Sequence, residues 1–194
     1  MTFAETVEHG GSASPHGATT FHAFLGCSLD GFIAGPHGEL DWLLQFDERL
    51  GETGYDDFFA SVDVLAMGRA TFETMRDSDP EFYRGKPIHV LSATMPAGAQ
   101  PAMGRSSVTV HPDIAGLREA LATAGVRRAY VDGGRTVQAF IAEGLLADII
   151  ITRVPILIGD GIPLFGAVPA PVYPTLVDTR QIAAGAVQST YRFG

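Results

Sequence analysis

Two stretches of the sequence place glycine and arginine together where an apolar run gives way to a helical pattern. They are VLAMGRATFETM, which contains Gly68 and Arg69, and AYVDGGRTVQAF, which contains Gly133, Gly134 and Arg135. A helix N-terminus carries unpaired N–H groups and partial positive charge, so it binds phosphate. Glycine lets the phosphate approach the backbone, and arginine adds a full charge. Two such helix starts suit a ligand with more than one phosphate group.

Each stretch also has a plainer interpretation. A Gly-Gly pair before a helix is also found in a simple tight turn, and Arg69 alone is typical of a surface ion pair. The fingerprint GxGxxG is absent, because its nearest match, GDGIPLFG, runs into Pro163 and no helical pattern follows. The Walker pattern is absent as well. The standard Rossmann and P-loop modes of nucleotide binding are therefore excluded.

Composition narrows the class of protein. The chain has 194 residues, 46% hydrophobic and 18% charged, which predicts one globular domain. A formal charge of −9 argues against a nucleic-acid partner. The longest apolar stretch is interrupted by Asp148, Arg153 and Pro155, and the first twenty residues lack the apolar core of a signal peptide, so no membrane partner is expected. A single cysteine, Cys27, favours a reduced, cytoplasmic location, and the histidines lack metal-ligand spacing.

The pattern along the chain predicts an α/β fold. Residues 1–19 read as a flexible tail and residues 20–194 as one domain, in which strands alternate with helices. Strands are expected within 21–28, 63–68, 86–92, 106–111, 126–132 and 147–156, with a final antiparallel pair within 173–182 and 185–193. Helices are expected within 53–62, 69–75, 112–125 and 135–144, the third capped by Asp113 and ended by Gly125.

Five segments together resemble a known family: CSLDGFIAGPHGELDWL, VLAMGRATFETM, PIHVLSATMP, AYVDGGRTVQAFI and RVPILIGDGIPLFG. In this order and spacing they are similar to the dihydrofolate reductase superfamily, in particular to its branch that resembles the reductase domain of the bacterial riboflavin-biosynthesis protein. The resemblance covers residues 21–193. It implies a three-layer dihydrofolate reductase-like fold, with a mostly parallel sheet of about eight strands and a C-terminal antiparallel hairpin. It also implies bound NADPH and a homodimer.

The resemblance assigns cofactor contacts to three parts of the chain. The adenosine side would be held by Gly68, Arg69, Thr71 and Ser92, the pyrophosphate by Gly133, Gly134, Arg135 and Thr136, and the nicotinamide by the loop containing Asp30, Ile33 and Ala34. Asp132 stands where the riboflavin branch often has an acidic residue, and it is included in the cofactor site. Arg69 is the cation best suited to a 2′-phosphate, followed by Arg135.

Hydride transfer also requires a source of protons or of electrostatic stabilisation. Asp47 lies five residues after Trp42, an offset that resembles the catalytic carboxylate of dihydrofolate reductases, although it could equally be a surface charge. Asp41 could face the substrate or could be a helix N-cap. Trp42 could form an aromatic wall for a flat heterocycle or belong to the core. Asp47 and Asp41 are the candidate catalytic residues.

The riboflavin-pathway substrate carries a ribose phosphate, so its pocket needs a cation. Arg153 is the candidate, and it could also be a charge at a strand edge. The loop with Gly159, Asp160 and Gly161 resembles a loop that closes the substrate pocket in this family. With a single cysteine the chain cannot form the zinc deaminase site that accompanies this reductase in many bacteria.

The sequence therefore predicts a cytoplasmic, NADPH-dependent oxidoreductase that acts on a pyrimidine or pterin type of heterocycle. The closest named activity is 5-amino-6-(5-phosphoribosylamino)uracil reductase of riboflavin biosynthesis. The alternatives are a true dihydrofolate reductase, and a non-catalytic nucleotide-binding or flavin-binding module on the same fold.

Overall fold

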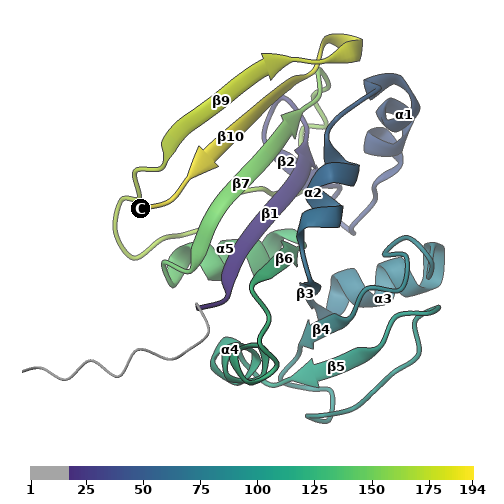
Figure 1. The fold of residues 1–194 in the computed structure, drawn as a ribbon. Helices are drawn as coiled ribbons and strands as arrows, with labels where there is room; N and C mark the ends of the chain where they lie inside the picture. The colour runs from purple at the N-terminus through teal and green to yellow at the C-terminus, as the bar shows by residue number, and fades with distance from the viewer. Residues whose placement is uncertain (1–17) are drawn as a thin grey trace, which may run out of the picture.

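The computed structural model of the chain describes residues 18–194, apart from the side chains of Asp47 and Glu48. The predicted tail lies outside the described residues up to residue 17. Figure 1 shows the elements of the described part. The strands are β1 Thr20–Cys27, β2 Phe32–Ala34, β3 Val64–Gly68, β4 Ile88–Leu91, β5 Val108–His111, β6 Arg128–Asp132, β7 Leu146–Arg153, β8 Ile162–Pro163, β9 Thr175–Gln181 and β10 Val187–Arg192. The helices are α1 Asp41–Leu50, α2 Tyr55–Ser61, α3 Arg69–Ser78, α4 Ile114–Thr123 and α5 Gly134–Ala142, with a 3₁₀ turn at Ala183–Gly185.

The central sheet has eight strands in the order β5-β4-β3-β6-β1-β7-β10-β9. The first six of these are parallel, whereas β10 runs antiparallel to both β7 and β9. The predicted parallel sheet with a C-terminal antiparallel hairpin is confirmed. Because parallel strands all end at the same edge, the residues that follow β3, β4 and β6 are brought together there.

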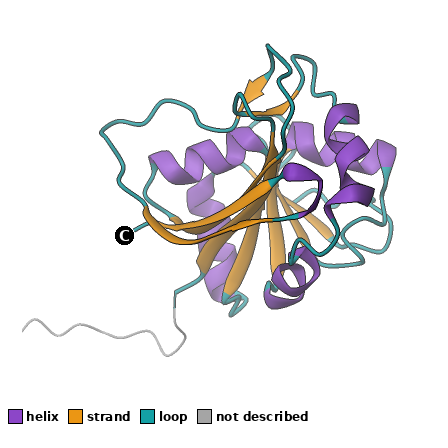
Figure 2. Cartoon of the chain, turned by 90° about the horizontal axis from the view of Figure 1, so that it is seen from above, coloured by secondary structure: helices purple, strands orange, loops and turns teal. Residues whose placement is uncertain are grey.

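Helices cover both faces of the sheet, as Figure 2 shows. On one face, alternate residues of β1 pack against α4 and α5 in a core that includes Leu117 and Phe140. On the other face, β3 and β6 pack against α2 and α3 through Phe58, Phe72 and Tyr130. The central strands are thus apolar on both sides, which is why they read as continuous hydrophobic runs.

The helix boundaries follow the predicted signals in most places. The Asp113 side chain accepts a hydrogen bond from Gly116 N–H at 2.8 Å, which confirms it as the N-cap of α4. Gly125 follows that helix with a φ of +68°, in the left-handed region that favours glycine. The helix after β3 is longer than expected and extends to Ser78.

Two short strands were not predicted. β2 and β8 pair with each other and form a small second sheet apart from the central one. They contain three and two residues, too few for an alternating pattern to be recognised in the sequence. The pairing joins the loop after β1 to the loop after β7.

A pair of histidines lies between the sheet and α4. His89 Nδ1 and His111 Nε2 are 2.8 Å apart, on the neighbouring strands β4 and β5. Burial and the neighbouring His111 lower the pKa of His89 to about 4, and burial also lowers the pKa of His111, against an opposing effect of Asp113. Folding therefore favours neutral imidazoles at this position.

This pair predicts acid sensitivity. A histidine whose pKa is lowered on folding contributes stability that is complete above its unfolded pKa of about 6.5 and is lost as the pH falls. Between pH 6.5 and 4 we expect a loss of about 1–2 kcal/mol, less than the full shift would give because His89 is partly exposed. Urea unfolding at several pH values measures it. A His89→Gln variant should lose much of this dependence, whereas a His37→Gln variant, changed at an exposed residue, should retain it.

Candidate functional site

The two glycine-arginine stretches lie side by side in the structure. β3 and β6 are adjacent parallel strands in which Met67 pairs with Asp132, so α3 and α5 begin next to each other. A Cβ atom added to Gly68 would lie 3.0 Å from Thr136 Oγ1, and one added to Gly133 would collide with Thr71 Oγ1. Gly68, at the junction of β3 and α3, thus packs on Thr136 of α5. Gly133, at the junction of β6 and α5, packs on Thr71 of α3. The predicted convergence of the two stretches is confirmed.

The glycines are required here for a different reason from the predicted one. Gly133 has a φ of +86°, and the place of its missing side chain is filled by Thr71. A Cβ on Gly134 would collide with Ile33 from the loop after β1. Gly133 N–H donates to Asp132 Oδ1 at 2.8 Å. The side chains of Thr71 and Ile33 therefore occupy the spaces beside Gly133 and Gly134 where the sequence pattern predicts a phosphate. Because Gly133 N–H is bonded to Asp132, the N–H groups that could bind a ligand begin at Gly134.

Both helices begin without a side-chain cap. The N-cap residues are Gly68 for α3 and Gly133 for α5, and neither helix start receives a hydrogen bond from its cap side chain. The first helical bond of α5 runs from Val137 N–H to Gly133 O at 3.0 Å, so the N–H groups of residues 134–136 precede it. The first turn of α5 therefore presents three backbone N–H groups that could donate to a ligand beside the start of α3.

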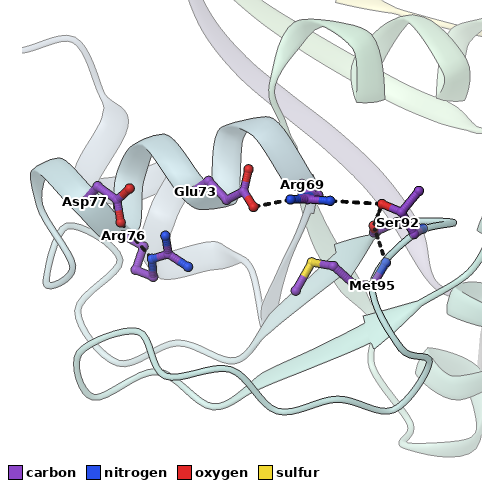
Figure 3. A network of polar contacts seen from close by, with 7 residues as sticks. Arg69, Glu73, Arg76, Asp77, Ser92 and Met95 are labelled. Atoms are coloured by element: carbon purple, nitrogen blue, oxygen red, sulfur yellow. Dashed lines mark hydrogen bonds and ion pairs between the residues drawn. The ribbon is translucent and has the colours of Figure 1, made fainter.

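Arginines lie at both helix starts. The Arg69 and Arg135 residues are exposed. As Figure 3 shows, Arg69 reaches Glu73 and the loop after β4: its Nε donates to Glu73 Oε1 at 2.7 Å and its Nη1 to Thr94 Oγ1 at 3.0 Å. A surface ion pair, the plainer interpretation of Arg69, is present. It lies at the edge where the predicted phosphate site is.

Ser92 shapes the loop that meets Arg69. Ser92 is buried, and its hydroxyl accepts a hydrogen bond from Met95 N–H at 3.1 Å, as Figure 3 shows, and another from Thr94 N–H at 3.3 Å. Because β4 is adjacent to β3, this loop lies beside the start of α3. The predicted adenosine-side residue is thus at the expected edge, with its side chain used to hold the loop.

Asp132 is tied to the core. Its Oδ2 accepts a hydrogen bond from the hydroxyl of Tyr83 at 2.5 Å, and Tyr83 is almost completely buried. Burial raises the pKa of the Asp132 carboxyl, while the hydrogen bonds from Tyr83 and from Gly133 N–H act in the opposite direction. Burial, and then the charge of Asp132, raise the pKa of Tyr83. Asp132 therefore fixes the end of β6 and the following glycine.

The loop after β1 is fastened to the loop after β7. The Asp30 carboxylate accepts hydrogen bonds from Ser28 Oγ at 2.6 Å and Gly159 N–H at 2.8 Å, and the Ser28 bond is the main cause of a lowered pKa of Asp30. Gly161 packs so closely on the Ala34 carbonyl that a Cβ would collide with it. The predicted nicotinamide loop and substrate loop are therefore one connected unit. Asp160 accepts a hydrogen bond from Gly161 N–H at 2.8 Å.

The first helix corrects one prediction. Leu40 is the N-cap of α1 and Asp41 is its first residue, exposed and without a capping bond, because the helix begins one residue earlier than an Asp41 cap requires. Trp42 is partly buried beside Phe46 and Val154, and its Nε1 has no hydrogen-bond partner in the described structure. The side chain of Asp47 is outside the described part, so its catalytic role stays a prediction.

Arg153 lies at the carboxyl end of β7, opposite Cys27 at the end of β1. Burial raises the pKa of the Cys27 thiol, and a hydrogen bond with Arg153 and its charge oppose this. Arg153 is exposed, and its position at this edge fits the predicted cation for a substrate anion. Arg153 thus lies where the loop after β1 and the loop after β7 begin, and Asp30 joins these two loops by hydrogen bonds.

Two shallow hollows lie at the opposite end of the sheet. One, of about 340 Å³, lies between Phe21 and α4, and the other, of about 400 Å³, includes Thr20, Arg127 and Arg128. Neither includes a residue of the glycine junctions. No helix of the described chain has both the length and the apolar character of a membrane span. Residues 18–194 contain no cluster of three or more metal-ligating side chains placed to hold an ion.

The eight-stranded sheet with its C-terminal antiparallel hairpin has the dihydrofolate reductase-like fold. The sequence profile of one family, described as the RibD C-terminal domain, matches residues 20–188, and the chain belongs to this family. The resemblance stated from the sequence is confirmed.

Two proteins of Bacillus subtilis (strain 168) are similar along most of the chain. The uncharacterized protein YwjB is 32% identical over 145 residues, which cover 73% of this chain and 80% of YwjB. The uncharacterized protein YyaP is 26% identical over 177 residues, which cover 87% of this chain and 92% of YyaP.

Solved structures agree with this assignment. A putative riboflavin biosynthesis protein from Shewanella sp. PV-4 superposes with a TM-score of 0.79 at 31% identity, over 91% of this chain and 99% of that one. A diaminohydroxyphosphoribosylaminopyrimidine deaminase/5-amino-6-(5-phosphoribosylamino)uracil reductase from Thermotoga maritima superposes with a TM-score of 0.68 over 91% of this chain. At 12% identity, and with 57% of that chain covered, this second match shows the fold alone.

Several residues of the site were not found from the sequence. Tyr83 and Thr94 lie in loops and reach the site only through the fold, and Ser28, although it lies in the first of the five resembling segments, was given no role. Glu73 had a signal, because it follows Arg69 by four residues in a predicted helix. The four-residue spacing of Arg69 and Glu73 on one helix is sufficient to predict their ion pair.

Proposed function

We propose that this protein is an NADPH-dependent reductase of a small heterocyclic substrate of pyrimidine or pterin type. The closest named activity is reduction of 5-amino-6-(5-phosphoribosylamino)uracil. Membership of the family supports a reductase of the riboflavin-pathway type. The observation that carries the proposal is the convergence of two uncapped helix starts, α3 and α5, each with an exposed arginine.

The residues of this edge fit such a cofactor. The first-turn N–H groups of α5 suit the pyrophosphate, Arg135 lies beside them, and Arg69 suits the 2′-phosphate. Ile33, which packs on Gly134, and Ala34 would border the nicotinamide and keep water away from it. When bound, NADPH supplies a hydride, and the chain must orient the substrate for it and provide a proton nearby.

On the substrate side, Arg153 would bind the phosphate of a ribosyl substrate through charge-assisted hydrogen bonds. Trp42 and the loop from Gly159 to Gly161 would border the heterocycle. Asp41 is an exposed carboxylate in the first turn of α1, and Asp47 lies on the same helix. These two are the proposed sources of the proton.

The cofactor assignment is tested by thermal unfolding with NADPH, NADH or flavin mononucleotide. A ligand at one hundred times its Kd stabilises the folded state by about 2.7 kcal/mol, which for a chain of this size raises Tm by about 5–10 °C. We expect NADPH to give the largest shift. Arg69→Ala should weaken NADPH binding about tenfold or more and remove the preference over NADH. A larger shift with flavin mononucleotide would contradict the assignment.

The reaction is tested by following NADPH oxidation with each candidate substrate. We expect oxidation with 5-amino-6-(5-phosphoribosylamino)uracil, and Arg153→Ala should raise KM for it. Oxidation with dihydrofolate alone would identify a dihydrofolate reductase instead. Cofactor binding without oxidation by any substrate would indicate a non-catalytic nucleotide-binding module.

We also propose a homodimer through the C-terminal hairpin. All seven residues of β9 are exposed at the edge of the sheet, including Leu176 and Val177, and Val187 of β10, which pairs with Gln181, is exposed as well. An exposed apolar edge strand is a template for pairing with another chain. Light scattering should give a dimer mass, which Val177→Lys should reduce to that of a monomer. Val168→Lys, at a comparably exposed loop residue, should leave the dimer intact. A monomeric wild type would contradict this proposal.

A further inference from the structure

The carboxylate of Glu73 lies at the predicted 2′-phosphate site. Glu73 is one helical turn after Arg69 on α3, and its Oε1 is 2.7 Å from Arg69 Nε. Figure 3 shows the two side chains together with Ser92 from the loop after β4. About half of the Arg69 side chain and two fifths of the Glu73 side chain are exposed, so both charges face solvent at the edge of the sheet.

The ion pair with Glu73 occupies the Nε–H group of the Arg69 guanidinium. Arg69 Nε is bonded to Glu73, and Nη1 donates to Thr94 Oγ1 at 3.0 Å. A phosphate binds arginine best through two parallel N–H bonds. A phosphate that used Nε would have to displace Glu73, and one that used the terminal nitrogens would lie close to its negative charge.

A carboxylate here also has a favourable role with a different cofactor. In Rossmann sites, which differ from this one in fold, an acidic side chain accepts a hydrogen bond from the ribose 2′-hydroxyl of NAD, whereas an arginine accommodates the 2′-phosphate of NADP, and the same pairing of groups applies at this edge. α3 carries both residue types in contact with each other. Such a site disfavours the 2′-phosphate relative to a site with arginine alone and accepts the 2′-hydroxyl.

We propose that Glu73 is a specificity-determining residue that limits the preference of this site for NADPH over NADH. The proposal rests on the proposed function, since it assigns the discriminating residue within the same cofactor site. It predicts that wild type binds both cofactors, with NADPH favoured by less than Arg69 alone would provide.

Glu73→Gln tests this directly. Glutamine can keep an oxygen acceptor for Arg69 Nε while removing the negative charge. Repulsion between a unit charge and a doubly charged phosphate at this partly exposed site corresponds to about a three- to tenfold change in affinity. We therefore expect the ratio of Kd for NADH to Kd for NADPH, measured by calorimetry, to rise about three- to tenfold. The increase should be smaller at high salt.

Asp77→Asn is the matched control. It removes the same charge from the same helix, in a pair with Arg76 at 2.7 Å (Figure 3). The ratio should stay at the wild-type value in this variant. An unchanged or lower ratio in Glu73→Gln, or an equal rise in both variants, would overturn the role of Glu73 while NADPH binding stands. A wild type that binds neither cofactor would overturn the proposed function and this inference together.

Discussion

Gly133→Ala is expected to destabilise the protein by about 2–4 kcal/mol and to abolish measurable NADPH binding. Gly133 has a φ of +86° and a ψ of 134°, a conformation that an L-residue adopts only under strain. The new methyl group would also collide with Thr71 Oγ1, which belongs to the other junction. The starts of α3 and α5 would have to move apart, and the backbone N–H groups of α5 would no longer lie beside Arg69 to bind one ligand. Chemical unfolding and calorimetric titration measure the two effects.

Two further variants separate strain from collision. Gly125 also has a positive φ, of +68°, but has nothing within 4 Å of an added Cβ, so Gly125→Ala should lose only about 1 kcal/mol and keep NADPH binding. Thr71→Ala in the Gly133→Ala background should restore part of the lost stability. If Gly133→Ala were no more costly than Gly125→Ala, the close packing of the junctions would be wrong.

Tyr83→Phe is expected to cost about 1.5–3 kcal/mol, because it removes the hydroxyl that donates to the partly buried Asp132 carboxylate. A partly buried carboxylate that loses one of its donors is less well compensated for the water that it has lost. Since Asp132 also holds Gly133 N–H, NADPH binding should weaken as well. Urea unfolding near neutral pH gives the stability.

The control for this variant is Tyr173→Phe, which removes a hydroxyl from a residue that is 86% exposed and should change stability by less than about 0.5 kcal/mol. In the Tyr83→Phe background, Asp132→Asn should cost less than it does in wild type, because the hydrogen bond between the two side chains is already absent. Additive losses would show that the two side chains are not coupled.

Most of the framework could be predicted from local signals. Continuous apolar runs gave the central strands, and Asp113 and Gly125 marked the ends of α4 because capping depends on neighbouring residues. The positions of Gly68 and Gly133 at strand ends gave the convergence of the two junctions, since parallel strands finish at one edge.

The side-chain partners could not be predicted in the same way. Tyr83 and Asp132 are 49 positions apart, and only the fold brings them into contact. The sequence located the glycines of the site correctly but did not give the full reason for them. Thr71 and Ile33 fill the spaces beside Gly133 and Gly134, so a side chain at either position would collide with them. The error in the cap interpretation of Asp41 came from a helix that begins one residue earlier than the cap pattern suggests.

A crystal structure of the protein with NADPH tests the central claim most directly. We predict the pyrophosphate within hydrogen-bond distance of the N–H groups of residues 134–136, and the 2′-phosphate beside Arg69. NADPH bound elsewhere on the molecule, or the absence of bound NADPH at millimolar concentration, would contradict the account.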